Sequence, residues 1–313
     1  MFYSLNMLYF LKFNFEYCYQ LQSLRDNIYI IETPYKMRGG YFVKKQIALI
    51  AGEGTLPVVI ANRLTDIGRA PIVYSIREHI GELSKYSRDI VNIARPDFGF
   101  IIKDMNKRGV KSIIMAGTVS KTLAFKPSLF DITTQKFLAG LIFRDDHSLL
   151  GAIVEFLEKA GFEVLSYKNI IPDLIAGIGH IAGRKPTKEE LNDVKYGFSI
   201  CRVTVPLSFG QTIIVHKKSV VAIEAMEGTD AALFRAGSLC KGGTVVKMMR
   251  LDQDERYDIP TVGPKTIEHM SEVKLNCLAL HAGSTLIMEP EKFKVAAEKA
   301  KIAVIGVDPC QSL

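Results

Sequence analysis

The stretch QIALIAGEGTLPVVIANRLTDIG, residues 46–68, decides the predicted fold of this 313-residue chain. It opens with an apolar run long enough for a buried strand, followed by glycines at Gly52 and Gly54 and then by apolar residues at helical spacing. A strand, a glycine turn and a helix in this order form the first unit of a layered α/β protein. We therefore expect a sheet of parallel strands that begins near residue 46.

The residues after this unit continue the alternation of strands and helices. Strands are predicted at PIVYS (71–75) and VKSIIMA (110–116). A core-facing helix is predicted at 145–159, where apolar residues recur at helical spacing, and a short strand follows at 162–165. The expected architecture of residues 44–180 is therefore a Rossmann-like α/β domain.

The second half of the chain predicts a mixed α/β domain, residues 181–308. A hinge is expected at AGRK (182–185), and Thr187 and Glu190 form the capping-box pattern that starts a helix. The further elements expected are strands at 212–216, 219–224, 244–248, 277–280 and 302–305, and helices near 230–236, 264–273 and 290–300.

Residues 1–43 differ from the rest of the chain, being rich in Phe, Tyr, Leu and Asn. They do not match a secretory signal, because no basic region precedes the apolar residues and Lys12 interrupts them. Two interpretations are open: an interfacial amphipathic segment, or a translated stretch upstream of a start at Met37. We expect an atypical extension in front of the two domains.

Composition narrows the classes of protein to be considered. The 40 basic and 33 acidic residues give a formal net charge of +7, which suits an anionic partner such as a phosphate or a membrane surface. Neither an RNP motif nor zinc-finger spacing is present, so we expect no nucleic-acid binding. The five cysteines lack any C-x-x-C pair, and apolar runs stay short of the roughly 20 residues that span a bilayer. A cytoplasmic protein without structural disulfides is expected.

A glycine turn, GEGTLP at 52–57, connects the first predicted strand to its helix. Glycines at this place let the backbone approach a phosphate, and the N–H groups of a helix start point toward it. Against a dinucleotide site, Pro57 occupies the third glycine position, and the strand at 71–75 ends without the acid that would hold a ribose hydroxyl. A phosphate or sugar contact and a turn that only requires positive φ both remain open.

Two acids flank a glycine and a threonine in EGTD, residues 227–230. Thr229 can cap the helix that follows, and Asp230 in its first turn would interact favourably with the helix dipole. In the functional alternative, Glu227 and Asp230 supply oxygen ligands for Mg²⁺ while the helix start and Arg235 contact a phosphate. The sequence leaves both interpretations open.

The segment QDERYDIP, residues 253–260, carries the charge pattern with the strongest functional signal. In an extended conformation, Asp254, Arg256 and Asp258 would share one face as an acid–cation–acid ladder. Asp258 stands between apolar neighbours, where an unpaired carboxylate is costly to bury, and Arg256 is its natural structural partner. The ladder also suits metal-assisted cleavage of a phosphoanhydride, in which carboxylates hold a cation or orient water and an arginine neutralises phosphate.

Other polar residues near these motifs are weaker candidates. Lys247, at the end of an apolar strand pattern, can add a second positive charge, and Gln211 before the strand at 212–216 can place an amide at a ligand. The six histidines are scattered without zincin spacing, and no serine lies in G-x-S-x-G. Covalent acyl transfer is therefore not expected.

With these motifs in hand, the chain resembles the UDP-2,3-diacylglucosamine pyrophosphatases of the LpxI family. The resemblance covers about residues 45–307. It rests on IALIAGEGTLP, GRAPIVY, MAGTVSK, DDHSLL, GFEVLS and GQTIIV, and above all on AIEAMEGTDAALFR (222–235) and QDERYDIPTVGPKTI (253–267).

The resemblance implies a function in lipid A biosynthesis. It implies Mg²⁺-dependent hydrolysis of UDP-2,3-diacylglucosamine to UMP and 2,3-diacylglucosamine 1-phosphate, by two domains with the ligand between them. Because this substrate carries two acyl chains, a peripheral position on the cytoplasmic face of the inner membrane is also implied, and a homodimer is left open. The family's essential aspartate falls on Asp258, with Asp230 nearby.

The residues and the resemblance together define three groups of expected site residues. Those expected in catalysis are Asp258, Asp230 and Arg256. Those expected to hold Mg²⁺ are Glu227, Asp230, Asp254 and Asp258. Those expected to bind substrate are Gly52, Gly54, Thr55, Leu56, Gln211, Gly228, Thr229, Arg235 and Lys247.

Two other functions stay open. An NAD(P)-linked oxidoreductase would use the glycine turn at 52–57. A non-catalytic protein that binds a UDP-sugar or a phospholipid is the other, because the chain departs from the family pattern at Ile178, where an acid is usual, and at Ser208, where an aspartate-containing turn is usual.

Overall fold

The computed structural model divides into two compact units, Met1–Ile170 and Ile171–Leu313, and each is described by itself. The described residues are 35–36, 42–43, 46–76, 81–93, 97–118, 131–139, 146–207, 210–250 and 253–310. Most of the predicted extension, residues 1–43, and Ser208 lie outside these ranges. Within the extension the structure describes two short strands, β1 (Tyr35–Lys36) and β2 (Phe42–Val43), which pair antiparallel.

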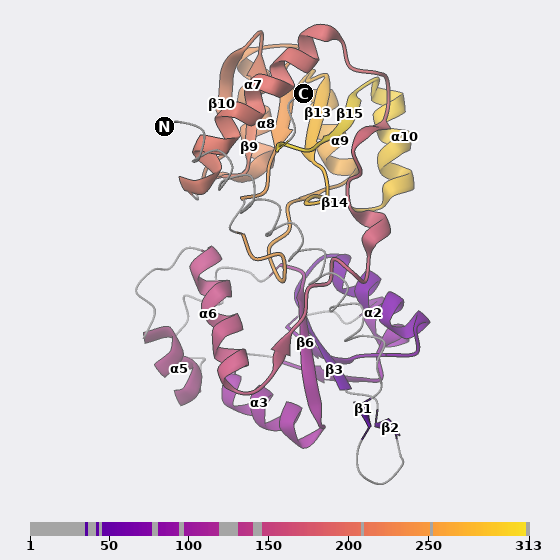
Figure 1. Ribbon diagram of the computed structural model, residues 1–313, viewed down its shortest axis with the longest axis vertical. Helices are drawn as coiled ribbons and strands as arrows, with labels where there is room; N and C mark the ends of the chain where they lie inside the picture. Colours follow the sequence, from indigo (N-terminus) through magenta and orange to yellow (C-terminus); the bar gives the residue numbers. More distant parts are fainter. Residues whose placement is uncertain are drawn as a thin grey trace, which may run out of the picture. The chain divides into compact units, whose positions relative to one another are not determined.

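The first unit contains the expected Rossmann-like sheet, of which Figure 1 labels β3 and β6. Its strand order is β5-β4-β3-β6-β7, and every pairing is parallel. Its strands are β3 (Gln46–Ala51), β4 (Ile72–Ser75), β5 (Asp89–Asn92), β6 (Val110–Ala116) and β7 (Glu163–Val164). Its α-helices are α2 (Leu56–Asp66), α3 (Phe98–Lys107), α5 (Ile132–Ala139) and α6 (Asp146–Lys159), and a 3-10 helix spans Gly81–Tyr86.

Continuous apolar runs produce this sheet because its central strands are covered on both faces. Ile47, Ala48 and Leu49 in β3 are all buried, as are Ile113 and Ile114 in β6. A strand of a parallel sheet with two covered faces has no polar side, so its sequence is uniformly apolar. The prediction of a parallel α/β layer is confirmed.

The second unit has a mixed sheet of order β10-β9-β11-β13-β15-β8, as predicted for this half of the chain. The strands β11, β13 and β15 run parallel, and β9 and β8 pair antiparallel with their neighbours. The strand bounds are β8 (Gly179–Ala182), β9 (Thr212–His216), β10 (Ser219–Ile223), β11 (Thr244–Lys247), β13 (Cys277–His281) and β15 (Ala303–Val307). A separate parallel pair joins β12 (Thr261–Val262) to β14 (Leu286–Ile287).

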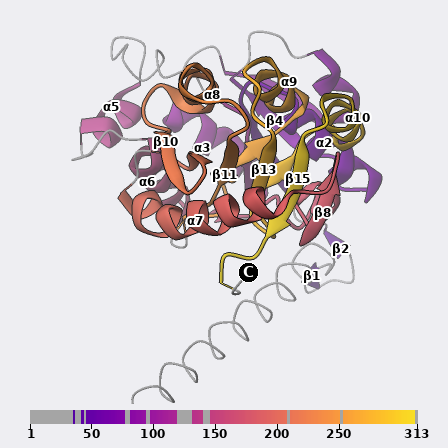
Figure 2. The ribbon, with the colours of Figure 1, turned by 90° about the horizontal axis from the view of Figure 1, so that it is seen from above.

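Helices cover both faces of this mixed sheet (Figure 2). One face carries α7 (Lys188–Thr204), and the other carries α8 (Gly228–Leu239), α9 (Pro264–Glu272) and α10 (Pro290–Ala300). Side chains alternate between the two cores along each strand: Val246 belongs to the core beneath α7, and Val245 to the core beneath the other three helices. The same alternation places Lys247, the last residue of β11, on the side of α8 and α9.

The two units divide earlier in the chain than predicted, after Ile170 rather than after residue 180. The strand β8 pairs with β15 and is therefore part of the second sheet. The expected hinge at 182–185 is likewise internal to this unit, because Gly183 packs so closely on Ile302 that an added Cβ would lie 1.9 Å from its carbonyl oxygen.

A capping box starts α7, as the sequence predicted. The Thr187 hydroxyl accepts from the Glu190 N–H at 3.2 Å, and the Glu190 carboxylate accepts from the Thr187 N–H at 2.7 Å. Glu190 is buried and also accepts from Arg184, 2.8 Å from Nη1. Burial alone would raise the pKa of Glu190, but these hydrogen bonds outweigh it and lower the pKa.

Glu190→Ala is expected to lower the free energy of unfolding by about 2 kcal/mol, because it removes the side-chain half of the capping box and leaves Arg184 without its buried partner. Glu189→Ala, next to it on the exposed face, should cost less than about 0.5 kcal/mol. Since the pKa of Glu190 is lowered on folding, its contribution is present above the usual value of 4.5 and is lost as the pH falls through the folded pKa. Denaturant titrations at pH 7 and pH 3 should show the difference between the variants shrinking at pH 3; an equal difference at both would contradict this account.

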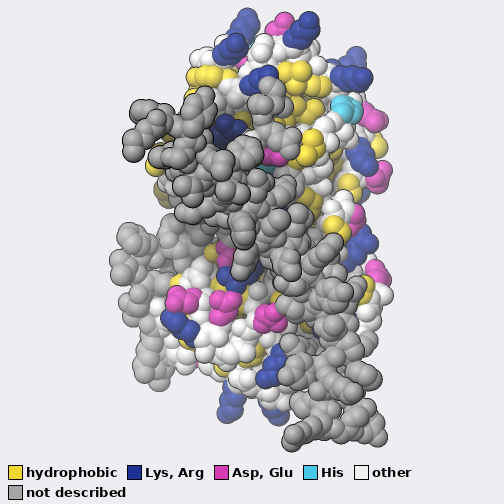
Figure 3. Space-filling view, in the orientation of Figure 1, with side chains coloured by type: hydrophobic (Ala, Val, Ile, Leu, Met, Phe, Trp, Pro, Cys, Tyr) yellow, Lys and Arg dark blue, Asp and Glu magenta, His cyan; other side chains and the backbone are white. Residues whose placement is uncertain are grey.

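The charge distribution on one face and the character of the helices bear on possible partners. On the face in Figure 3, the Lys and Arg side chains of the described residues are spread among acidic and uncharged ones rather than gathered in one patch. Within the described ranges, no helix combines the length and the apolar character that crossing a membrane requires.

Candidate functional site

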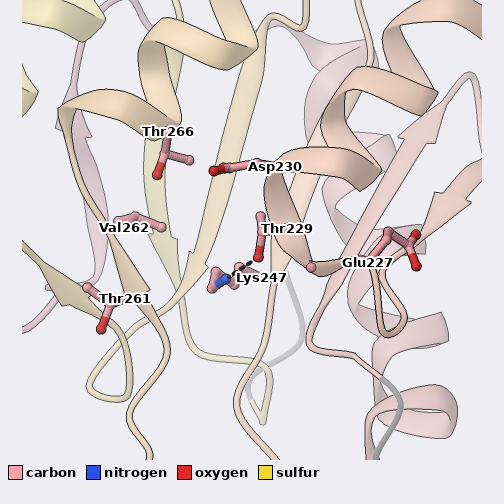
Figure 4. Close-up of a pocket in the computed structure, with 8 residues that line it drawn as sticks. Glu227, Thr229, Asp230, Lys247, Thr261, Val262 and Thr266 are labelled. Atoms are coloured by element: carbon pink, nitrogen blue, oxygen red, sulfur yellow. Dashed lines mark hydrogen bonds between the residues drawn. The ribbon is translucent and has the colours of Figure 1, made fainter. Parts of the chain in front are cut away.

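A pocket of about 370 Å³ opens in the second unit where β11 ends and two helices begin (Figure 4). In open α/β sheets, ligands bind beyond the carboxyl ends of the parallel strands. The first turns of α8 and α9 both border the pocket, so the positive dipole ends of two helices face the same space. Its lining residues are Glu227, Gly228, Thr229, Asp230, Lys247, Thr261, Val262 and Thr266.

Lys247 is the buried cation of this pocket, with only 7% of its surface exposed. Its ammonium group donates to the hydroxyls of Thr229 at 3.0 Å and of Thr212 at 3.4 Å. Burial lowers the pKa of Lys247, while the charges of Glu224, Asp230 and Asp258 act in the opposite direction. The site therefore combines one buried amine with three carboxylates close enough to influence it.

Glu224 contacts the pocket residue Thr229. The Thr229 hydroxyl donates to Glu224 Oε1 at 2.7 Å, and the Gln211 N–H donates to Glu224 Oε2 at 3.3 Å. Thr229 consequently does not cap α8 by its side chain, which was one interpretation of the sequence. Its hydroxyl instead links Glu224 to Lys247, because it donates to the carboxylate and accepts from the amine.

The EGTD motif separates into two parts with different partners. Gly228 has a φ of +82° and lets the chain turn into α8, and Asp230 lies in the first turn as predicted. Asp230 Oδ1 is 3.0 Å from Nδ1 of His269 on α9. Glu227 points away from Lys247 in Figure 4 and pairs with Arg235 Nη2 at 2.5 Å. The sequence predicted that Glu227 binds a metal and that Arg235 contacts a phosphate, but in the structure the two side chains form an ion pair with each other.

The acid–cation–acid ladder predicted for QDERYDIP is wrong, because residues 255–257 form a turn and not a strand. The Asp254 carboxylate accepts from the Arg256 N–H at 3.0 Å, which closes the turn, and from Arg256 Nε at 2.9 Å. Aspartate commonly bonds to the backbone two residues on in this way. Arg256 is therefore paired with Asp254.

Asp258 is bound by a residue that the sequence reasoning missed. Its carbonyl oxygen accepts from Gln253 Nε2 at 2.7 Å, and its carboxylate accepts from the same nitrogen. The available signal was the position of Gln253 at the head of the QDERYDIP motif. The pocket lining contains three further residues that were not predicted, Thr261, Val262 and Thr266. Their signal was Gly263-Pro264, a helix start that follows Thr261 and Val262 directly.

No protein-only metal cage is assembled among the described residues, which contain no group of three or more His, Cys, Asp or Glu suited to a metal ion. Of the four predicted ligands, Glu227 and Asp254 pair with arginines. The other two, Asp230 and Asp258, are both among the charges that act on Lys247. Mg²⁺ is commonly held by one or two carboxylates together with substrate phosphates, so these side chains are of the type that it takes as ligands.

The glycine turn predicted to contact substrate lies in the first unit, between β3 and α2. Gly52 follows β3 and Gly117 follows β6, and the backbones of these two segments are in close contact. An added Cβ on Gly52 would lie 2.5 Å from the Thr118 carbonyl oxygen, and one on Gly117 would lie 2.6 Å from the Glu53 carbonyl oxygen. Backbone packing therefore accounts for Gly52 without a ligand. Gly54 has a φ of +98° and open space around it, and it leads through Thr55 and Leu56 into α2.

Comparison with known proteins agrees with this two-unit arrangement. A family model described as the LpxI N-terminal domain matches residues 46–174, and one described as the LpxI C-terminal domain matches residues 177–305. The chain is also 30% identical, over 278 residues, to the UDP-2,3-diacylglucosamine pyrophosphatase LpxI of Caulobacter vibrioides. That match covers 85% of this chain and 98% of the relative. The chain therefore belongs to the LpxI family.

Proposed function

We propose that this protein hydrolyses the pyrophosphate bond of UDP-2,3-diacylglucosamine, with Mg²⁺, to UMP and 2,3-diacylglucosamine 1-phosphate. The observation that carries the proposal is the pocket in which buried Lys247 and the first turns of α8 and α9 converge, with Asp258 among the charges that act on Lys247. A pyrophosphate matches the buried amine and the two helix starts. The name of the Caulobacter relative supports the choice of substrate.

Each group in the pocket has a role in this reaction. Lys247 donates to the pyrophosphate oxygens, where negative charge grows in the transition state, and the positive dipole ends of α8 and α9 attract the same charge. Asp258 orients the attacking water and accepts its proton. A P–O bond forms to the water oxygen while the anhydride P–O bond breaks, and the departing phosphate takes the bonding electrons. Attack at either phosphorus gives the same two products.

Charge in the pocket supports the need for a divalent cation. Glu224, Asp230 and Asp258 all act on one lysine, so carboxylates outnumber the buried amine before substrate arrives. The attraction between Lys247 and a pyrophosphate would not by itself offset the repulsion between the three carboxylates and that pyrophosphate. Asp230 and Asp258 would hold Mg²⁺, which when bound would neutralise charge on the pyrophosphate oxygens.

The proposed substrate also implies contact with a membrane surface, because its acyl chains reside in the bilayer. Met226, which precedes the EGTD motif beside the pocket, is fully exposed, and Val203 and Leu207 are also largely exposed. Single exposed apolar side chains are common on proteins, so they support this part of the proposal only together with the substrate. A peripheral position on the inner membrane, with no nucleic-acid partner, follows from the proposal.

Product analysis tests the proposed reaction. The purified chain, incubated with UDP-2,3-diacylglucosamine and Mg²⁺ in detergent, should release UMP together with the lipid 1-phosphate, and excess EDTA should stop the release. UDP-N-acetylglucosamine, which lacks the acyl chains, is the matched control and should be cleaved far more slowly. Release of UDP, or ligand binding without any UMP, would contradict the proposal. Tight binding of NADH at the glycine turn would favour the oxidoreductase instead.

A further inference from the structure

Gln253 is a buried amide whose two ends face different parts of the site, and only 7% of its surface is exposed. Its Nε2 donates to the carbonyl oxygen of Asp258 at 2.7 Å and also to the Asp258 carboxylate. Its Oε1 accepts from Gln211 Nε2 at 2.9 Å and from the Arg250 N–H at 3.2 Å. Two donors and two acceptor positions are the full capacity of a glutamine amide, so each is used.

The orientation of this amide is fixed by its neighbours. The Arg250 N–H can only donate, so it requires an oxygen of Gln253, and the Asp258 carbonyl can only accept, so it requires the nitrogen. Rotation of the amide by half a turn would set donor against donor at one end and acceptor against acceptor at the other. A fully satisfied buried network of this kind holds its members rigidly.

We propose that Gln253 is a positioning residue for Asp258. It donates hydrogen bonds to both the main-chain carbonyl and the carboxylate of Asp258. These two bonds fix the orientation of the carboxylate and therefore the direction of its second oxygen. Gln211, which the sequence assigned to substrate binding, contributes to the same support, because its side chain donates to Gln253 and its backbone donates to Glu224. The support thus joins Asp258 to the Glu224–Thr229–Lys247 contacts. This inference rests on the proposed function, in which Asp258 acts on water.

Two substitutions of similar length test the proposal. Gln253→Glu keeps the shape but sets a carboxylate against the carboxylate and carbonyl of Asp258, and Gln253→Met keeps the length but can neither donate nor accept. Both should lower kcat for UMP release by about 10–100-fold, the usual effect of removing a supporting residue, with KM changed less than about threefold. Gln135→Glu makes the same chemical change at an exposed position of α5 and should leave both constants unchanged. Thermal melting identifies any loss due to unfolding.

A second measurement does not depend on turnover. In protein labelled with ¹⁵N-glutamine, the side-chain amide signals of Gln253 are those absent from Gln253→Met, and they should shift and exchange faster with solvent in Asp258→Ala. Unchanged Gln253 signals in Asp258→Ala would overturn the inference. So would a folded Gln253→Met with wild-type kcat, or a loss that appears only in KM. If wild type releases no UMP while the amide signals respond to Asp258→Ala, the proposed reaction fails and the positioning contact stands.

Discussion

Asp258→Ala is expected to lower kcat for UMP release by about 10²–10⁴-fold, the range over which a positioned acid or base contributes to catalysis. Two nearby acids, Asp254 and Glu227, are paired with Arg256 and Arg235, and Glu224 accepts from Thr229, so none of these three is expected to replace it. KM should change much less, because Lys247 and the helix starts still bind the pyrophosphate. Steady-state UMP release at saturating substrate measures the effect.

The controls for Asp258→Ala distinguish a loss of catalysis from a loss of folding and from the loss of one negative charge in the unit. Asp173→Ala, on an exposed 3-10 turn of the same unit, removes one acid away from the pocket and should retain wild-type kcat. Asp254→Ala opens the turn but spares Asp258, so its loss should be smaller than that of Asp258→Ala. A folded Asp258→Ala with normal turnover would remove Asp258 from the mechanism.

Lys247→Met is expected to lower kcat/KM by about 10²–10³-fold, comparable to the loss of one donor to a developing oxyanion. Methionine fills nearly the same buried volume but leaves Glu224, Asp230 and Asp258 without the cation on which all three act. The net charge of the pocket would then be more negative, and the pocket would repel the pyrophosphate more strongly. Kinetics over a range of Mg²⁺ concentrations should show that the variant needs more Mg²⁺ than wild type.

The matched control for Lys247→Met is Lys299→Met, an exposed lysine on α10 that loses the same charge. It should retain wild-type kcat/KM. Equal effects of the two substitutions would show that net charge matters and the buried position does not. Chemical denaturation of both variants is needed, since loss of the buried amine also removes its hydrogen bonds to Thr212 and Thr229.

Much of the fold was predictable because buried strands and helix starts have recognisable sequence patterns. Uniform apolar runs marked the parallel strands, and the spacing of Thr187 and Glu190 marked the start of α7. The division between the units was harder to place. The strand β8 is four residues long and pairs with β15, which is more than a hundred residues later in the chain, and local patterns carry no information about such pairing.

The site was predicted only in part, because short polar segments obey no periodicity. Asp254, Arg256 and Asp258 alternate as in a strand, yet the hydrogen bonds of Asp254 to Arg256 fold them into a turn. Lys247 was expected at the end of an apolar strand, and it is the last residue of β11. Gln253 was missed, because its position at the head of the QDERYDIP motif does not by itself distinguish a buried glutamine with four hydrogen bonds from a solvated one.

The most direct test of the central claim is ³¹P NMR of UDP-2,3-diacylglucosamine mixed with stoichiometric protein and Mg²⁺. With wild type, the two pyrophosphate signals should be replaced by two phosphomonoester signals, those of UMP and of the lipid 1-phosphate. With Asp258→Ala, the pyrophosphate signals should persist over the same time. Persistence with wild type, or equal conversion by both proteins, would contradict pyrophosphate hydrolysis at this pocket.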